Sequence, residues 1–556
     1  MVGPAADAVN MCTAAGTVTG SVAAALQFFA LAQCLIQEPW PKAAQVQNDT
    51  AFDFIVVGAG TAGSVLASRL ADLDGVSVLL IEAGGDPPQE SIIPGYHDVL
   101  KGTKYDWNFT TVNDKSSSQA LKGGSQKQPR GKLLGGSGSI SDMVYSRGFP
   151  EDYNDWAAAV GQEWGWDNVL EHFKKTEHMT DERIINSRNL MAYHGLAGEI
   201  EVGGTNRSTF PTEKFLEAFQ EMGFSMVQDM TNPEQLGVGR FSHTIRNGQR
   251  DSAVTALLNK AAYGIGPKEH LEEMSIPVVK DLPVGENLHD HVMVVAFLAT
   301  EKGTCTMEEK DKYMQTIQYL YNRSGSLSDT NSMGAYVALE NETTKTKPKV
   351  PDFGMYPVCV PVNAGFYKGC EVALGYEDQI CRELDTLNQD YELIAIAVVL
   401  LKPKSRGKVR LNSKNPFEAP LIYSGTFSND DDLADFPRAL TLAYGLANTT
   451  YFSGKRAFVV DLKVDACSLV SGDDKLRCQA RALATPAWHA AGTAAMGSVL
   501  DARLRVRGVR GLRVVDASVM PTVVRGNTNA PVIMIAEQAA DFIKEELNVV
   551  THYDVE

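Results

Sequence analysis

A short apolar run followed by a glycine-rich turn constrains this chain more than any other feature. Residues 54–57 read Phe-Ile-Val-Val, which is typical of a strand buried on both faces of a parallel sheet. The turn 58–63 follows, then residues 64–73 with apolar positions at helical spacing, and then a second apolar strand at 76–81. This order of strand, turn, helix and strand predicts a β-α-β unit.

The turn carries Gly58, Gly60 and Gly63 in the spacing G-x-G-x-x-G, and Glu82 ends the second strand. Gly58 permits a tight turn, Gly60 lets the backbone approach a pyrophosphate, and Gly63 lets the helix pack closely on the strand. The N–H groups of the helix N-terminus would then face the phosphates. A carboxylate at Glu82 suits ribose hydroxyls, so the unit predicts dinucleotide binding rather than a purely structural turn.

A second loop, residues 129–139, reads Pro-Arg-Gly-Lys-Leu-Leu-Gly-Gly-Ser-Gly-Ser. Its many backbone donors suit an anionic pyrophosphate or the edge of a flavin. Such a loop is also consistent with a flexible linker, but the dinucleotide turn nearby weakens that alternative.

Length and charge limit the classes of function. The 556 residues allow one large domain or two joined domains, and the net charge is −17. A nucleic-acid binder needs basic surface to replace phosphate counterions, so we expect no nucleic-acid partner. Residues 290–470 have polar stretches, Pro and Gly punctuation and an isolated strand at 393–401, which predicts a second domain inserted into the first.

The N-terminal residues 1–49 are interpreted as a leader or a peripheral helical segment. Their apolar run, 22–36, is interrupted by two glutamines and is too short to cross a bilayer, so we expect no membrane span. A secretory signal prefers a basic start, yet Asp7 is the only charged side chain in the first 37 residues. A signal peptide and an amphipathic helix therefore both remain open.

Cysteines and glycosylation sequons bear on the compartment. Six of the eight cysteines follow residue 34, and none forms a C-x-x-C pair, so no metal site is expected. Six N-x-S/T triplets begin at Asn48, Asn108, Asn206, Asn322, Asn341 and Asn448. Together with the even cysteine count they favour a secreted, extracellular protein, with a cytoplasmic location as the alternative.

A candidate catalytic histidine lies near the C-terminus. His489 stands in Trp-His-Ala-Ala-Gly-Thr, residues 488–493. Asp516 follows a predicted short strand at 512–515, and Asn527 lies eleven residues further on. A lone histidine is more often structural, so its functional reading depends on this context. Residues 531–547 then predict a helix with a face of small residues.

These stretches together resemble the glucose-methanol-choline (GMC) oxidoreductases, which use FAD, and the insect branch of that family most of all. The matching segments are residues 53–85, 130–148, 264–291, 403–411 and 489–540. The resemblance implies an α/β plus α+β fold: a Rossmann-like FAD-binding domain of the GMC type, with an inserted substrate-binding domain built on an antiparallel sheet. The implied ranges are 50–150, 195–290 and 480–550 for the FAD-binding domain, and 151–194 and 291–479 for the substrate-binding domain.

The resemblance also implies residue roles. The position of His489 is that of the catalytic base, and Asn527 faces the same substrate carbon. The implied FAD-binding positions are Gly58, Gly60, Thr61, Ala62, Gly63, Glu82, Ala83, Trp107, Arg130, Leu134, Gly135, Gly136, Ser137, Ser141, Met143, Asp516, Ala517 and Thr528.

The implied reaction is hydride transfer from an alcohol carbon to flavin N5 while a base takes the hydroxyl proton. An aliphatic alcohol has a pKa of roughly 16, about 9 units above that of histidine, which corresponds to roughly 13 kcal/mol. Proton removal must therefore be coupled to hydride departure, or Asn527 and its neighbours must stabilise the alkoxide. The resemblance implies an ecdysteroid 3-hydroxyl as substrate and oxygen as acceptor; the alternative is a sugar with a quinone-type acceptor.

Two departures from the family pattern stand out. Ser141 occupies a position where the family has Asn. Between residues 258 and 264 the chain lacks several dozen residues, including a strand of the FAD sheet, and this loss should expose the edge of the neighbouring strand. An impaired protein that no longer holds FAD is therefore one alternative. A second is an NAD-dependent dehydrogenase, since Glu82 suits either dinucleotide, although the segments 130–148 and 516–527 argue against it.

Overall fold

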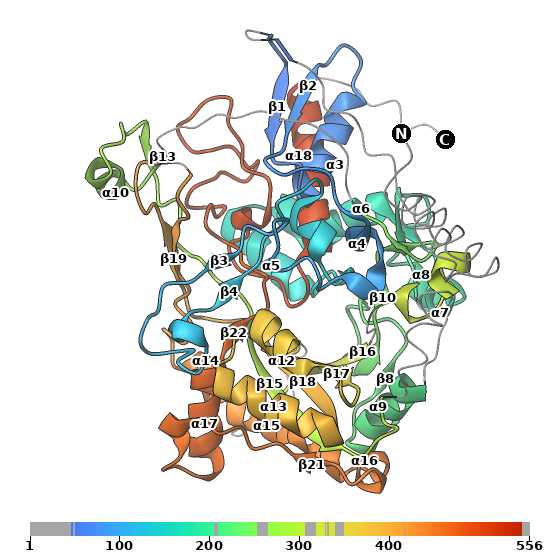
Figure 1. The fold of residues 1–556 in the computed structure, drawn as a ribbon. Coiled ribbons are helices and arrows are strands. Elements are labelled where there is room, and N and C mark those ends of the chain that lie inside the picture. The colour runs from blue at the N-terminus through green and yellow to red at the C-terminus, as the bar shows by residue number, and fades with distance from the viewer. Residues whose placement is uncertain are drawn as a thin grey trace, which may run out of the picture.

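The computed structural model describes residues 46–47, 50–204, 210–252, 265–305, 318–328, 330, 333–339, 350–415 and 417–547. The leader or peripheral helix expected at 1–49 lies almost wholly outside these residues. An upper part is built around the N-terminal β-α-β unit, and a lower part around a broad sheet (Figure 1). Every helix in the described residues is too short or too polar to cross a lipid bilayer.

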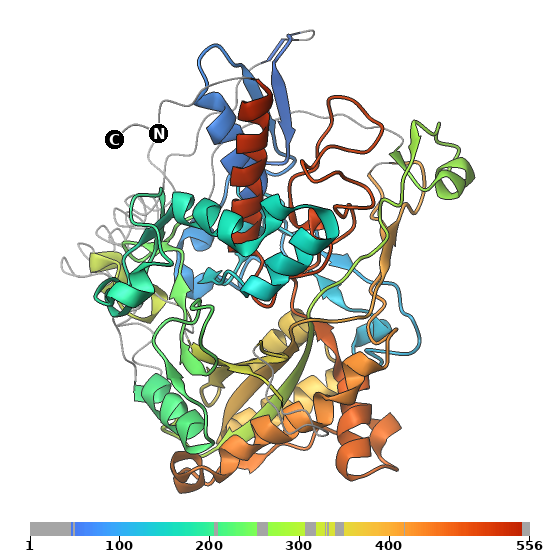
Figure 2. The ribbon, with the colours of Figure 1, turned by 180° about the vertical axis from the view of Figure 1, so that it is seen from behind.

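The β-α-β unit forms as predicted. It consists of β1 (Phe54–Val57), α3 (Thr61–Ala71) and β2 (Val78–Ile81), with the two strands parallel. Helix α3 packs against the long C-terminal helix α18 (Asn529–Glu546), which confirms the helix predicted at 531–547. Seen from behind, α18 stands beside this unit along most of its own length (Figure 2).

Strand β1 is not buried on both faces, and that expectation was wrong. Ile55 and Val57 are 58% and 64% exposed, whereas Leu80 and Ile81 of β2 are buried. Within the described residues β1 pairs only with β2, so its other edge and one of its faces have no neighbour. This edge is consistent with the open edge expected from the shortened segment, but residues 253–264 themselves lie outside the described residues, so the cause of the open edge stays a prediction.

The lower part is built on an eight-stranded sheet, which confirms the predicted antiparallel sheet. Its strand order is β21-β15-β18-β17-β16-β9-β8, with β22 added to β15, and only β8 and β9 pair in parallel. The strands are β8 (Met226–Val227), β9 (Val238–Arg240), β15 (Val292–Thr300), β16 (Met333–Val337), β17 (Phe353–Val360), β18 (Glu392–Leu400), β21 (Phe458–Val459) and β22 (Thr485–Pro486). Strand β18 matches the strand predicted at 393–401.

The two faces of this sheet have different partners. Helices α15 (Phe436–Gly445) and α17 (Gly472–Leu483) pack on one face and close a large apolar core with it. On the other face, Phe149 and Tyr336 belong to a smaller aromatic cluster that lies toward the upper part. Strands β8 and β9 lie within 195–290, the range assigned to the FAD-binding domain, yet they pair in this sheet; the domain boundaries otherwise stay a prediction.

The remaining helices and strands have the following bounds. The other helices are α4 (Gln89–Ile92), α5 (Pro150–Val160), α6 (Trp166–Thr176), α7 (Glu182–Ile185), α8 (Arg188–Met191), α9 (Phe210–Glu221), α10 (Lys268–Glu273), α12 (Phe366–Gly369), α13 (Asp378–Asp390), α14 (Asp431–Ala434) and α16 (Thr450–Gly454). The other strands are β3 (Phe109–Thr110), β4 (Lys127–Gln128), β5 (Val144–Tyr145), β6 (Glu177–Met179), β7 (Ile200–Val202), β10 (Ser242–His243), β11 (Ile245–Arg246), β12 (Gln249–Arg250), β13 (Ile265–Gly266), β14 (Lys280–Asp281), β19 (Lys408–Arg410) and β20 (Leu421–Tyr423).

One predicted strand does not form. Residues 512–515 run as irregular chain, and only Arg513 pairs there, in an isolated bridge with Arg505. The side chains of 512–515 are half-buried. Their apolar pattern therefore reflects packing against the core and not membership of a sheet.

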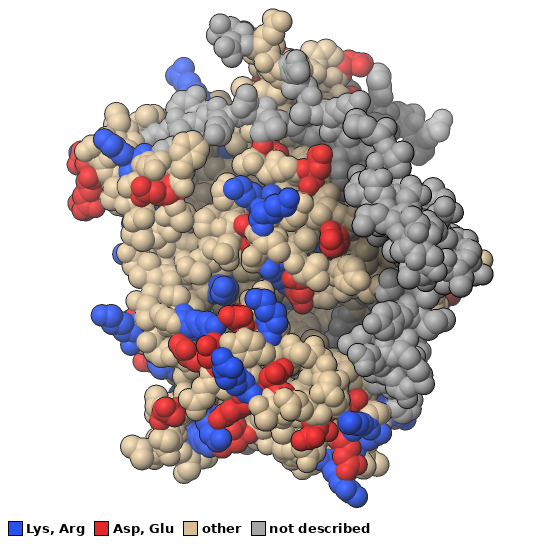
Figure 3. All heavy atoms as spheres, in the orientation of Figure 1, with Lys and Arg blue, Asp and Glu red and all other residues tan. Residues whose placement is uncertain are grey.

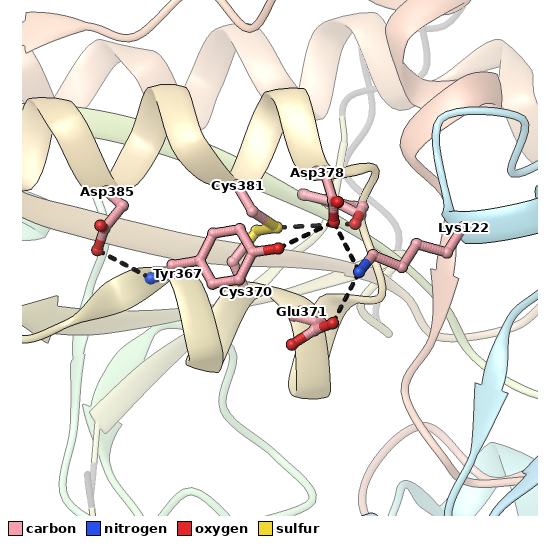
Figure 4. The surroundings of a disulfide bond; sticks show 8 residues. Lys122, Tyr367, Cys370, Glu371, Asp378, Cys381 and Asp385 are labelled. Atoms are coloured by element: carbon pink, nitrogen blue, oxygen red, sulfur yellow. Dashed lines mark hydrogen bonds and ion pairs between the residues drawn. A yellow bond between two sulfur atoms is a disulfide. The ribbon is translucent and has the colours of Figure 1, made fainter.

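Three disulfides join Cys305 to Cys359, Cys370 to Cys381, and Cys467 to Cys478. Figure 4 shows the second of them, which ties α13 to the turn after α12. Beside it, Lys122 lies 2.7 Å from both Glu371 and Asp378 and links an upper loop to the lower part. On the face drawn in Figure 3, basic and acidic side chains are interspersed in this way.

Candidate active site

Two glycine-rich loops meet at the N-terminus of α3. Gly60 forms a bridge with Gly135, and Gly135 N donates to Ala59 O at 2.7 Å. A Cβ on Gly136 would lie 2.9 Å from Gly60 Cα, so only glycine allows this approach. The dinucleotide turn and the loop 129–139, far apart in sequence, thus form one backbone surface.

The turn is held in shape by Glu82. Its Oε2 accepts from Ala59 N at 2.9 Å and its Oε1 from Gly84 N at 2.8 Å. Each carboxylate oxygen has a second lone pair, which remains suited to a ribose hydroxyl. Gly63 is required for packing, because a Cβ there would lie 1.8 Å from Gly58 O.

The N-terminus of α3 has the features of an anion-binding site. Gly60 is its N-cap, and no acidic residue occupies its first turn. Thr61 Oγ1 donates to Asn529 Oδ1 at 2.9 Å, so the starts of α3 and α18 meet here. The unpaired N–H groups and the helix dipole favour a phosphate at this point.

Ser141, which stands where the family pattern has Asn, makes side-chain hydrogen bonds of its own. Its Oγ accepts from Arg250 Nη1 at 3.1 Å and lies 3.1 Å from Gly138 O. Arg250 also donates to Ser91 O at 2.7 Å and to Gly138 O at 2.9 Å. Burial lowers the pKa of Arg250 to about 10, which leaves it charged at neutral pH. A guanidinium therefore stands beside the loop that was expected to face the flavin.

The structure brings His489 and Asn527 together and adds a second histidine. His489 Nδ1 lies 2.9 Å from His291 Nδ1, and His489 Nε2 lies 3.2 Å from Asn527 Nδ2. His291 Nε2 lies 3.0 Å from Val524 O. The two imidazoles are nearly perpendicular, at 80°.

The direction of each hydrogen bond follows from its partners. Val524 O can only accept, so His291 Nε2 carries a hydrogen and, in the neutral ring, His291 Nδ1 carries a lone pair. His489 Nδ1 must then donate to His291, which leaves the lone pair of His489 on Nε2. That lone pair faces the Asn527 amide, where a substrate hydroxyl would be placed between a base and a donor.

Burial keeps both rings neutral. It lowers the pKa of His291 to about 4, because the loss of water outweighs the opposing effects of the bond to Val524 O and of the Asp152 charge. Burial also lowers the pKa of His489 well below its usual 6.5, and His291 and Arg130 act in the same direction. The His489 Nε2 lone pair is therefore available at neutral pH.

The backbone of His489 is fixed by Asp290, whose Oδ1 accepts from His489 N at 2.8 Å. Burial raises the pKa of Asp290 to about 7, against the opposite effect of Arg130. The side chains of Asp290, Arg130 and His291 line a cavity of about 270 Å³. Three buried atoms of its lining, Asp290 Oδ2, His289 Nε2 and Thr485 Oγ1, have no hydrogen-bond partner among the described residues.

A charged cluster adjoins the residue before His489. Lys101 Nζ stands 4.1 Å from the centre of the Trp488 ring. It also lies 2.5 Å from Asp98 and 3.4 Å from Asp142, so this lysine already neutralises the acidic pair.

The other predicted cofactor residues surround the same region. Ala62, Leu134 and Met143 are buried, and Trp107 is 41% exposed and stacks on Phe109. Asp516 caps the turn η9 (Ala517–Val519) through Ser518 N, and Ala517 O accepts from Gly492 N, which joins this turn to the loop after His489. Thr528 is the N-cap of α18, Ser137 Oγ accepts from Gly131 N, and Ala83 is exposed beyond β2. Their roles in binding stay a prediction.

These residues fit FAD at its pyrophosphate and flavin ends. The two glycine-rich loops present bare backbone, which a side chain at their contact would cover. The N-terminus of α3 offers unpaired N–H groups beside them. The buried Trp488 Nε1 donor has no partner in the described residues and suits an acceptor on a bound group. By contrast, no other strand of the described part of the chain pairs with the free edge of β1.

Sequence reasoning missed His291 and Asp290 as members of the site. Both lie in Glu-Asn-Leu-His-Asp-His, residues 286–291, directly before β15. Two histidines and an acid at the start of a buried strand were the available signal. Strand β22 pairs with β15, and Ala487 N donates to His291 O at 2.9 Å, so the pairing register brings His291 next to His489.

Two family models with the description GMC oxidoreductase match the chain, one over residues 52–263 and the other over 403–536. An ecdysone oxidase of Bombyx mori is 50% identical, with 97% of this chain and 89% of the relative covered. An ecdysone oxidase of Spodoptera littoralis is 50% identical over 97% of this chain and 99% of its own. A glucose dehydrogenase of Drosophila melanogaster is 29% identical over 93% of this chain and 91% of its own.

The alignment with the Bombyx mori protein is 598 positions long, more than the 556 residues of this chain. That relative therefore carries residues without a counterpart here, as the shortened segment predicts.

Solved structures show the same fold. The formate oxidase of Aspergillus oryzae superposes with a TM-score of 0.76 at 23% identity, with 90% of this chain and 100% of that chain covered. A fungal aryl-alcohol oxidase gives a TM-score of 0.70 at 22% identity over the same shares. The fold, the family models and the two relatives at 50% identity lead to one conclusion: the chain belongs to the GMC oxidoreductases and is an FAD-dependent oxidoreductase that acts on alcohol groups.

Proposed function

We propose that this protein oxidises the 3-hydroxyl of an ecdysteroid to a ketone, with oxygen as the electron acceptor. The observation in the site that best supports this proposal is the position of the His489 Nε2 lone pair. Nε2 lies 3.2 Å from the Asn527 amide nitrogen, and the hydrogen bond between His489 Nδ1 and His291 leaves the lone pair on Nε2. The choice of substrate is supported by 50% identity to two ecdysone oxidases, against 29% to the glucose dehydrogenases.

His489 and Asn527 divide the work on the alcohol. His489 Nε2 takes the hydroxyl proton, and its Nδ1–H remains bonded to His291 while the ring becomes positive. Asn527 Nδ2 donates to the alcohol oxygen and stabilises the negative charge that develops there. The chemistry that FAD supplies when bound is acceptance of the hydride that leaves the alcohol carbon.

The atoms and electrons balance with oxygen as co-substrate. The O–H pair becomes the second bond of the carbonyl, and the C–H pair leaves as hydride. Oxygen takes up two electrons and two protons, so one alcohol and one oxygen give one ketone and one hydrogen peroxide.

A first experiment decides whether the chain holds a flavin at all. The purified protein is examined by visible absorption before and after addition of FAD. A flavin band that remains with the protein after gel filtration supports the proposal, and a protein fraction that is colourless after incubation with FAD and gel filtration refutes it for this chain.

A second experiment separates the substrates and acceptors. Turnover of ecdysone and of glucose is compared in one preparation, with oxygen or with a quinone as acceptor and with peroxide as the readout. We expect ecdysone-dependent peroxide and a loss of about 10²–10⁴-fold in His489→Ala. Glucose oxidation that requires a quinone would favour the glucose dehydrogenase alternative instead.

We propose further that the protein is secreted. Disulfides persist in oxidising compartments, and the described residues contain three. The sequon residues Asn108, Asn322 and Asn448 are exposed, as glycan attachment requires. Expression in insect cells should yield protein in the medium whose mass falls on treatment with an N-glycosidase. Unglycosylated protein confined to the cell would support the cytoplasmic alternative.

A further inference from the structure

The loop 522–527, between η9 and α18, supplies two atoms of the histidine network. Val524 O accepts from His291 Nε2 at 3.0 Å, and Asn527 Nδ2 faces His489 Nε2 at 3.2 Å. The loop has no regular secondary structure, so contacts from outside must hold these atoms in place.

Asp152, in the first turn of α5, makes the central contact with this loop. Its side chain is fully buried. Oδ2 accepts from Arg525 N at 2.8 Å, and Oδ1 accepts from Arg525 Nη1 at 2.5 Å. Arg525 lies directly after Val524 and two residues before Asn527, so this bond fixes the loop between its two functional atoms.

Lys402 secures the same carboxylate from the end of β18. Its Nζ lies 2.9 Å from Asp152 Oδ1, 3.1 Å from Thr522 Oγ1 and 3.4 Å from Val523 O. Trp156, one turn further along α5, donates from Nε1 to Thr522 O at 3.0 Å. The loop is thus clamped between α5 and the large sheet by one buried carboxylate and two cations.

We propose that Asp152 is a positioning residue for alcohol oxidation. Through Arg525 and Lys402 it holds the loop 522–527 so that Val524 O and Asn527 reach the two histidines. Asp152 hydrogen-bonds to the loop and to neither histidine, so its contacts act on the reaction through this geometry. Its charge also raises the pKa of His291, and loop exchange is the readout that does not depend on that charge. The expected change in kcat rests on the proposed function, whereas the expected change in the mobility of the loop 522–527 does not.

The test is Asp152→Asn, which keeps the shape of the side chain and removes its charge. Hydrogen–deuterium exchange of the amides in 522–527 is measured in the full-length protein without substrate. We expect exchange faster by about tenfold or more. For whichever alcohol the wild type oxidises, kcat should fall about 10–100-fold while KM changes less than about threefold, because misplacement by 1 Å acts on the chemical step.

Asp229→Asn is the matched control. Asp229 is 2% exposed and accepts from Thr231 N at 2.8 Å and His194 Nε2 at 3.0 Å, with no contact to the loop. We expect it to lower the thermal midpoint yet leave loop exchange and kcat unchanged. Where Asp152→Asn does not fold, Lys402→Met gives the same readouts with a smaller change. Unaltered loop exchange in both loop variants, or an equal change in Asp229→Asn, would overturn the proposal.

Discussion

Replacement of His291 tests the hydrogen-bond chain that leaves the lone pair of His489 on Nε2. His291 is fully buried and makes two bonds, one to Val524 O and one to His489 Nδ1. His291→Phe keeps an aromatic ring, although a larger one than imidazole, and leaves both partners unpaired. Each buried unpaired group costs about 1–3 kcal/mol, so the free energy of unfolding should fall by roughly 2–6 kcal/mol.

The effect on the reaction is separable from this loss of stability. One hydrogen bond of about 1 kcal/mol favours the productive tautomer of His489 by roughly fivefold. Loss of ring orientation adds to this, so we expect flavin reduction by alcohol to slow between about 5-fold and 100-fold. Stopped-flow absorbance of the enzyme-bound flavin measures this rate directly.

Two amide variants divide the roles of the two imidazole nitrogens. In His291→Asn the side-chain oxygen falls near the position of Nδ1 and can still accept from His489, whereas the bond to Val524 is lost. In His291→Gln the amide nitrogen falls near Nε2 and can still donate to Val524 O, whereas the acceptor for His489 is lost. The Asn variant should therefore reduce flavin faster than the Gln variant at similar thermal stability. Equal rates, or a Gln variant as fast as the wild type, would refute the assignment of the base to Nε2.

Three further predictions follow from burial and covalent structure. Because burial lowers the pKa of His489 well below 6.5, protonation of the base should cause no loss of kcat/KM as the pH falls to 6.5. A limb near 7 that disappears in Asp290→Asn belongs to Asp290, whose pKa is about 7; a limb at or above 6.5 that persists in this variant would mean that the base is another group. Removal of the disulfide Cys305–Cys359, which spans 54 residues, should lower the free energy of unfolding by about 4 kcal/mol. Removal of Cys467–Cys478, which spans 11 residues, should lower it by about 3 kcal/mol, and chemical denaturation of the two variants with serine pairs tests this order. Ile55→Lys should change the thermal midpoint little, since Ile55 is 58% exposed, whereas Leu80→Lys, at 4% exposure, should lower it by many degrees; equal losses would show that the β1 face is covered.

Local pattern predicted the elements whose neighbours are close in sequence. The unit β1-α3-β2 formed because its glycine spacing, helix and second strand all fall within 30 residues. The strand expected at 393–401 and the helix at 531–547 formed for the same reason, since length and apolar periodicity identify each element. The placement of His489 opposite Asn527 came instead from resemblance to a family, and the structure brings the two side chains to 3.2 Å.

Long-range pairing explains what the sequence could not show. His291 lies 198 residues before His489, and only the pairing of β22 with β15 brings the two rings together. A register of this kind depends on the whole sheet and leaves no local signature. The exposure of Ile55 has a related cause, because an apolar run indicates a buried strand but not whether the neighbouring strand exists.

The two ends of the site depend on different parts of the chain. The catalytic end is assembled from the segments 289–291, 487–493 and 522–527, which meet through buried hydrogen bonds. The nucleotide end depends on β1, α3 and β2, and among the described residues the sheet of these two strands has an open edge at β1. The resemblance predicts missing chain between residues 258 and 264, and none of the catalytic segments adjoins these positions, so a loss there should act on the nucleotide end first. We infer that its consequence is weaker retention of FAD, while the proton-transfer geometry at His489 remains complete.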